Sequence, residues 1–190
     1  NSLSNHSNVR FVEQNSVVKV ESTSDDSYYT SGNLWGMYGD LSTPANIYGS
    51  QASEAWNTGF IGTTKTVLGV IDTGIDYTHP DLFQNIWINQ KEISTTLRGS
   101  LTDVDSDGVI SFVDLNHAAN VTYVSDLNNN SRIDAGDLLA DSRWEDGNDL
   151  DLNGYIDDIV GWDFVNNDNN PMDDAQHGTH VAGTIGAMGG

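Results

Sequence analysis

Two polar residues far apart in this sequence have the types and surroundings needed for proton transfer. Asp72 ends an apolar run at residues 67–71, and His177 begins a run of small residues at 178–184. Imidazole is the side chain that most often takes a proton from a nucleophile, and a carboxylate can hold that imidazole in the required tautomer. We therefore predict that Asp72 and His177 are catalytic, as the orienting acid and the base of an Asp-His-Ser triad.

A second set of residues carries oxygen donors suited to a hard cation. Three similar repeats begin at Asp103, Asp126 and Asp149, evenly spaced along the chain, and each has Ile at its eighth position. An EF-hand-type loop places ligands at positions 1, 3, 5, 7 (backbone), 9 and 12 and prefers Gly at position 6. The predicted calcium ligands in the three repeats are Asp103, Asp105, Asp107, Val109, Ser111 and Asp114; Asp126, Asn128, Asn130, Arg132, Asp134 and Asp137; Asp149, Asp151, Asn153, Tyr155 and Asp157.

The three repeats do not fit the pattern equally well. The first repeat (residues 103–114) fits every position except the twelfth, which is Asp rather than Glu. The second (126–137) has Ser at position 6 and fewer charges, so we expect weaker binding there. The third (149–160) has an apolar residue at position 12. Acidic turns that bind no metal are the alternative interpretation for each repeat.

Composition excludes several classes of partner. The 190 residues include 28 Asp and Glu against 7 Lys and Arg, a net charge of -21. Such a charge argues against nucleic acid or an anionic membrane as partner. The sequence has no Cys, which excludes disulfides and leaves metal as the expected stabilising element, and no apolar run approaches the ~18 residues of a membrane span.

The predicted elements would position the catalytic pair on a rigid frame. Residues 67–71 are too apolar for a half-exposed strand and are typical of a parallel sheet, where sites form at the carboxyl ends of strands. Residues 177–187 suit a helix whose small residues press against that sheet. We also predict a strand at residues 8–20, a polar linker at 21–31 and a helix that begins at Thr43-Pro44 and ends at Gly59. The expected fold class is α/β, a parallel sheet flanked by helices with an irregular calcium-loop insertion that has little apolar content.

Two motifs resemble those of the subtilisin-like serine proteases, the subtilases. One is Asp-Thr-Gly-Ile-Asp at residues 72–76 with His-Pro-Asp-Leu at 79–82, and the other is His-Gly-Thr-His-Val-Ala-Gly-Thr-Ile at 177–185. The resemblance implies a serine endopeptidase that acts on proteins or peptides, and it adds Asp81 as a calcium ligand. The family's serine motif, Gly-Thr-Ser-x-Ala, does not occur in these residues. The nucleophile is therefore expected beyond Gly190, and this segment alone should be inactive.

The same resemblance implies a domain organisation. Residues 1–33 are similar to a propeptide tail and linker, and residues 34–190 to the N-terminal part of a catalytic domain. The first two repeats resemble EF-hand or dockerin loops inserted at about residues 96–160. The expected protein is a secreted monomer made as a zymogen, whose partners are Ca²⁺, its substrates and its own propeptide.

Three rival interpretations use the same residues. An aspartic protease would need a second Asp-Thr-Gly or a symmetric dimer, and a zinc protease would need His-Glu-x-x-His, and the sequence contains neither motif. A catalytically dead subtilase-like module that binds partners through its calcium loops remains the alternative function.

Overall fold

The computed structural model describes residues 24–188, so the strand predicted at residues 8–20 lies outside the described residues. The chain divides into two compact units, Asn1–Ile61 and Gly62–Gly190.

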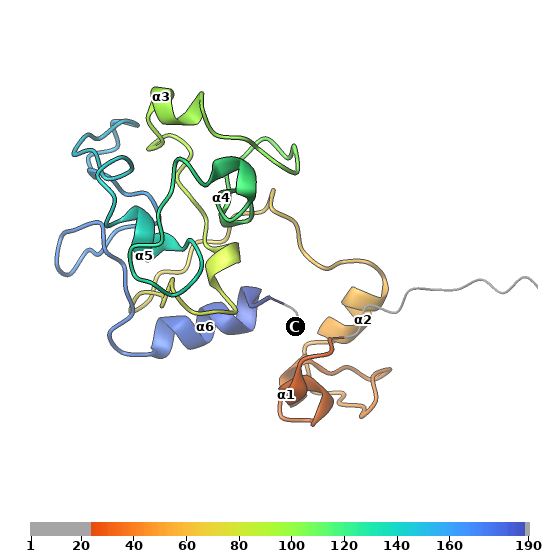
Figure 1. The fold of residues 1–190 in the computed structure, drawn as a ribbon. Helices are drawn as coiled ribbons and strands as arrows, with labels where there is room; N and C mark the ends of the chain where they lie inside the picture. The colour runs from red at the N-terminus through yellow and green to blue at the C-terminus, as the bar shows by residue number, and fades with distance from the viewer. Residues whose placement is uncertain (1–23, 189–190) are drawn as a thin grey trace, which may run out of the picture. The chain divides into compact units, whose positions relative to one another are not determined.

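The first unit contains α1 (Ser27–Thr30) and α2 (Ala52–Asn57), which are labelled in Figure 1, and the 3₁₀ helix η1 (Trp35–Met37). Asp26 caps α1 by accepting hydrogen bonds from the backbone N–H groups of Tyr28 and Tyr29. The Tyr29 ring is buried edge-on against Tyr38, with the ring centroids 4.8 Å apart. Residues 27–30, expected in an exposed linker, therefore form a helix that contributes to this unit's core.

The helix predicted from Thr43 begins instead at Ala52. Side chains before it bond to the backbone and stabilise turns in place of a helix. The Ser42 hydroxyl donates to the carbonyl of Pro44, and the Asn46 amide donates to the carbonyl of Trp35. The start predicted from the Thr-Pro pair was therefore wrong.

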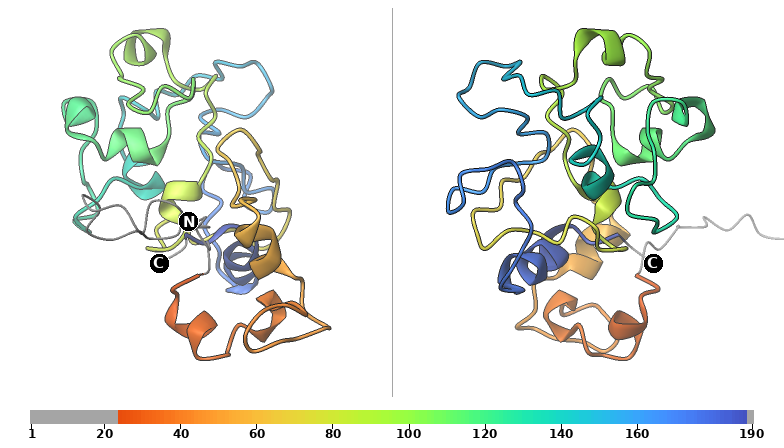
Figure 2. Two further views of the ribbon diagram at one scale, coloured as in Figure 1. Left: turned by 90° about the vertical axis from the view of Figure 1, so that its right-hand side faces the viewer. Right: turned by 60° about the vertical axis from the view of Figure 1, so that its left-hand side comes forward.

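The second unit is built mainly from loops, into which short helices are set (Figure 2). Its longest helix is α6 (His177–Gly186), with 10 residues. The other elements are η2 (Phe83–Asn85), α3 (Thr95–Arg98), α4 (Phe112–Leu115), η3 (Ala118–Asn120) and α5 (Ala135–Leu138).

The first two acidic repeats each lead directly into a helix. Ser111 and Asp114 form a capping box at the start of α4, and Asp134 and Asp137 form one at the start of α5. In each box, two side chains satisfy backbone N–H groups that a helix start leaves without partners. Positions 9 and 12 of these repeats thus have a structural role that requires no metal.

These short helices also supply the core of the second unit. Phe112 is fully buried, and Leu115 and Leu138 are each 1% exposed. They join one apolar cluster with Ile88 and Ile159. The insertion was expected to have little apolar content of its own, and that expectation was wrong, because the helices after its loops carry core residues.

The expected parallel sheet stays a prediction. Residues 67–71 make no strand pairing, and Ile71 is fully exposed. Between residues 24 and 188, the pairing outside helices and turns is one antiparallel bridge, Asp163 with Asp168. An isolated apolar strand needs neighbouring strands for its backbone hydrogen bonds. In the part of the chain that the structure describes, no helix is long and apolar enough to cross a membrane.

Candidate active site and acidic loops

The structure brings Asp72 and His177 into direct contact. Nδ1 of His177, the first residue of α6, lies 2.6 Å from Oδ1 of Asp72, although 105 residues separate them. The Asp72 side chain is 17% exposed and the His177 side chain is 69% exposed. A carboxylate on Nδ1 holds the proton there, so Nε2 is left as the basic nitrogen.

Each member of the pair changes the pKa of the other. The hydrogen bond to His177 lowers the pKa of Asp72 below its ordinary value, with help from the backbone N–H of Thr73. The hydrogen bond and the negative charge of Asp72 raise the pKa of His177. Asp72 therefore stays ionised while His177 titrates, as an orienting acid and a base require.

Asp173 connects the two motifs, and the sequence patterns did not single it out. Its Oδ1 accepts a 2.8 Å hydrogen bond from the Thr73 hydroxyl, and its Oδ2 accepts a 2.6 Å bond from the Thr179 hydroxyl. Oδ1 also accepts from the backbone N–H groups of Ala175 and Gln176. Desolvation opposes ionisation of Asp173, but the hydrogen bonds, led by that from Thr179, lower its pKa well below the ordinary value. Its position shortly before α6 is visible in the sequence, but that position does not identify its hydrogen-bond partners.

Further hydrogen bonds cross directly between the motifs. The backbone N–H of Gly178 donates to the Thr73 hydroxyl at 3.0 Å, and the backbone N–H of Asp76 donates to the Thr179 hydroxyl at 2.8 Å. Both hydroxyls also donate to Asp173. The two threonines thus each act as donor and acceptor, which fixes the start of α6 against the segment after Asp72.

The glycines of the two motifs allow a close backbone approach. A Cβ atom added to Gly178 would lie 2.0 Å from the carbonyl oxygen of Gly74. Gly74 itself has a φ of +105°, and a Cβ there would lie 2.6 Å from the carbonyl oxygen of Pro171. Gly178 must therefore be glycine because there is no space for a Cβ atom. Gly74 must be glycine both for space and for its backbone conformation.

The first acidic repeat forms a tight turn with converging carboxylates. Asp103 accepts from the backbone N–H groups of Asp107 and Gly108, and Asp114 accepts from that of Val104. Carboxylate oxygens of Asp103, Asp105 and Asp114 lie within 4.8 Å of one another. Desolvation, together with the neighbouring negative charges, raises the pKa of Asp105. A cation that neutralises these oxygens would fit the chemistry of this group.

The second repeat follows the same backbone path. Asp126 accepts from the backbone N–H groups of Asn130 and Ser131, and Asp137 accepts from that of Leu127 at 2.7 Å. These bonds match those made by Asp103 and Asp114 in the first repeat. The side chains that face Asp134 differ, however, because they are the amides of Asn128 and Asn130 and the guanidinium of Arg132.

The third repeat recruits a carboxylate from outside itself. Glu92, which is 3% exposed, accepts from the backbone N–H of Asp151 at 2.9 Å and that of Leu150 at 3.4 Å. In the first repeat, position 12 makes the corresponding bond. Glu92, Asp151 and Asp158 have oxygens within 4.8 Å of one another, and burial raises the pKa of Glu92. Glu92 thus replaces the apolar twelfth residue, Val160.

Asp157 and Asp81 are predicted ligands that lie outside the converging acidic groups. Asp157 points away from the third repeat, since its carboxylate accepts from the backbone N–H groups of Asp146 and Gly147. Burial raises the pKa of Asp157. Asp81 is exposed and, among the described residues, belongs to neither converging acidic group. The sequence offered no signal for Glu92, because it precedes even the first repeat in the chain.

An exposed histidine held by a carboxylate is the arrangement that nucleophilic hydrolases use for their base. Comparison with known proteins gives the family: residues 63–190 match the subtilase family, and the chain belongs to it. It is 36% identical over 125 residues to Subtilisin-like protease 1 of Plasmodium falciparum (isolate 3D7), a match covering 66% of this chain and 11% of that protein. Subtilisin-like protease 1 of Plasmodium vivax is 33% identical over 139 residues, 73% of this chain and 14% of that protein.

A bacterial relative matches over more of the sequence. The Thermophilic serine proteinase of Bacillus sp. (strain AK1) is 26% identical over 185 residues, which is 97% of this chain and 25% of that protein. The chain therefore spans a quarter or less of the length of these curated relatives.

Proposed function

We propose that this chain supplies the acid and the base of a serine endopeptidase. The observation that carries the proposal is the 2.6 Å contact between Asp72 Oδ1 and His177 Nδ1. Family membership supports it, as do the names of the relatives. The serine nucleophile would come from a Gly-Thr-Ser-x-Ala motif outside these 190 residues.

The residues present would perform one part of peptide hydrolysis. Nε2 of His177 would take the proton of the serine hydroxyl and later give it to the leaving amine. Asp72 would keep the proton on Nδ1 and stabilise the imidazolium ion that forms. The rigid connection through Asp173 would hold the imidazole in place, which matters because a displacement of about 1 Å can cost about a hundredfold in rate.

The test uses the full-length protein that contains this sequence. Asp72→Asn and His177→Ala should each lower peptide hydrolysis by orders of magnitude, since comparable Asp→Asn changes cost about 10⁴-fold. His180→Ala, which removes an exposed histidine on the same helix, is the matched control and should retain turnover. Equal activity in all three variants would reject the pair. A wild-type protein that neither hydrolyses peptides nor reacts with fluorophosphonates would instead support the catalytically dead module.

We also propose that the first and third repeats bind Ca²⁺. Both present three converging carboxylates, the hard oxygen donors that calcium prefers. Asp103, Asp105 and Asp114 would hold one ion, and Glu92, Asp151 and Asp158 another. Bound calcium would neutralise the mutual repulsion of these carboxylates and stabilise the loops. A secreted location, a propeptide partner and a monomeric state are further proposals, and Asp81 would serve as an additional ligand.

A further inference from the structure

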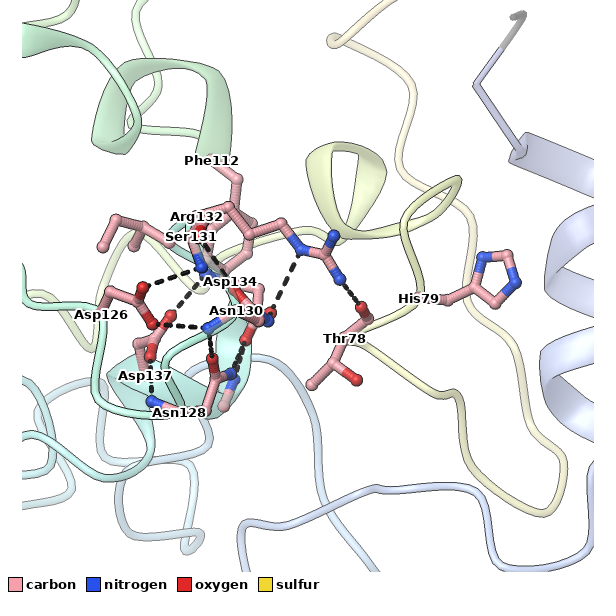
Figure 3. Close-up of polar contacts among 12 residues, drawn as sticks. Thr78, His79, Phe112, Asp126, Asn128, Asn130, Ser131, Arg132, Asp134 and Asp137 are labelled. Atoms are coloured by element: carbon pink, nitrogen blue, oxygen red, sulfur yellow. Dashed lines mark hydrogen bonds and ion pairs between the residues drawn. The ribbon is translucent and has the colours of Figure 1, made fainter.

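The second repeat surrounds its central carboxylate with donors from the protein. Asp134 is fully buried. Its Oδ1 accepts from the Asn128 amide at 3.1 Å, and its Oδ2 accepts from the Asn130 amide at 2.6 Å (Figure 3). Nε of Arg132 lies 3.5 Å from Oδ2, in ion-pair range. Asp134 therefore contacts a fixed positive charge and two amide groups.

The charge of this repeat sets it apart from the other two. The first repeat has four carboxylates and no basic residue. The third repeat also has four carboxylates when Glu92 is counted in place of Asp157, which points away from the loop. The second repeat has three carboxylates and the guanidinium of Arg132. Asn153 also donates to a carboxylate in the third repeat, but three carboxylates still converge there. Within residues 24–188, the carboxylates of the second repeat form no such group.

Arg132 is held in place on several sides. It lies over the ring of Phe83, with 4.8 Å between the guanidinium carbon and the ring centroid, and its side chain is 24% exposed. Its terminal nitrogen donates to the carbonyl oxygen of Thr78. Arginine stays charged at all relevant pH values and stacks well on aromatic rings. Unlike an ion, this charge cannot dissociate from the loop.

We propose that Arg132, with the amides of Asn128 and Asn130, takes the place of a cation in the second repeat. The repeat then keeps its fold and its contact with Thr78 whether calcium is present or absent. Arg132 is thereby a positioning residue for the segment that follows the catalytic aspartate.

A short series of contacts links that segment to the catalytic helix. The backbone N–H and the hydroxyl of Thr78 both donate to the Asp76 carboxylate, at 3.0 and 2.7 Å. The backbone N–H of Asp76 donates to Thr179, which lies on α6 close after His177. A calcium-independent second repeat would therefore support the active site when the other repeats lose their ions.

Native mass spectrometry of the full-length protein in calcium tests whether the second repeat binds a calcium ion. Asp103→Asn in the first repeat should remove one calcium ion, whereas the corresponding Asp126→Asn in the second should remove none. The triple variant Asn128→Asp, Asn130→Asp, Arg132→Val copies the first repeat at these positions and should gain one ion. Loss of an ion in Asp126→Asn would overturn the inference.

Hydrogen exchange tests whether Arg132 keeps the second repeat folded. The measured exchange rates do not depend on whether the proposed calcium sites bind calcium. In the wild type, the amides of Leu127 and Ser131 should exchange at the same rate in calcium and in chelator. Arg132→Met should accelerate them roughly tenfold to a hundredfold in both conditions, because a buried carboxylate loses a charged partner. Arg132→Lys should restore part of the protection, and Arg143→Met, which removes an arginine from another ion pair, should leave these amides unchanged.

The comparison of calcium binding between the repeats rests on the proposed function. The outcomes distinguish a failure of the proposed calcium sites from a failure of the role proposed for Arg132. If no repeat binds calcium, the proposed calcium sites fail, while the exchange rates still decide the role of Arg132. Chelator-sensitive exchange at Leu127 and Ser131 would overturn that role. So would wild-type exchange in Arg132→Met.

Discussion

The closest backbone approach in the site yields a sharp prediction for Gly178→Ala. Ordinary contact to a Cβ atom begins near 3.4 Å, and the new Cβ would lie 2.0 Å from the carbonyl oxygen of Gly74. The two segments must therefore move apart by most of the difference between these distances. Neither side can yield cheaply, because the atom met belongs to the backbone and lies next to the contact between Asp72 and His177.

The cost should appear in both stability and rate. Overpacking typically costs about 1–3 kcal/mol of unfolding free energy, and misplacement by about 1 Å can lower turnover about a hundredfold. We expect Gly178→Ala in the full-length protein to lower turnover by at least about a hundredfold and to lower the free energy of unfolding. Urea unfolding and peptide hydrolysis at saturating substrate would measure the two effects separately.

Gly183→Ala is the matched control, on the same helix. A Cβ atom at Gly183 meets nothing within 4 Å, and Gly183 does not have a positive φ. In a helix interior alanine is more favourable than glycine by about 1 kcal/mol. The Gly183→Ala variant should therefore be at least as stable as the wild type and fully active. If Gly178→Ala behaved like Gly183→Ala, the close packing of the two motifs would be refuted.

Three further predictions concern charge. Asp72→Asn should move the acid limb of the pH–rate profile to lower pH, because the carboxylate that raises the pKa of His177 is gone and a base must be neutral to act; an unchanged limb would contradict this. Asp173→Asn should lower the melting temperature at neutral pH. Since hydrogen bonds hold the folded pKa of Asp173 below its unfolded value, the difference from wild type should persist above about pH 4 and shrink in stronger acid; calorimetry across this range checks the sign. Glu92→Gln should reduce the melting-temperature gain in millimolar calcium, whereas Asp157→Asn should retain it; equal gains would remove Glu92 from the proposed calcium site.

Asp72 and His177, the proposed catalytic pair, could be selected from the sequence because each residue stands in a short, distinctive pattern. An apolar run before Asp72 and small residues after His177 identify the motifs without any knowledge of their distance. The same holds for the repeats, since the ligand spacing of an EF-hand-type loop is local. In all three repeats a backbone N–H group donates to the carboxylate of the first aspartate, and the EF-hand-type loop itself stays a prediction.

The residues that complete these sites could not be found in this way. Glu92 lies far before the third repeat in the chain, Asp173 joins two motifs that are distant in sequence, and Arg132 looked like an ordinary position-7 residue in its loop. Their roles depend on which backbone N–H and carbonyl groups they meet after folding. Local patterns carry no information about such partners, because the contacts form between distant segments.

The elements were predicted with uneven success for the same reason. Helix α6 was expected from its composition and was found at His177–Gly186, whereas the Thr43 start was wrong because nearby side chains bond to the backbone instead. The sequence by itself determined the chemical groups of the site and the local turns that present them. Only the tertiary structure decided which distant carboxylate or threonine completes each group and what Arg132 contacts, since burial and hydrogen bonding are properties of the packed chain.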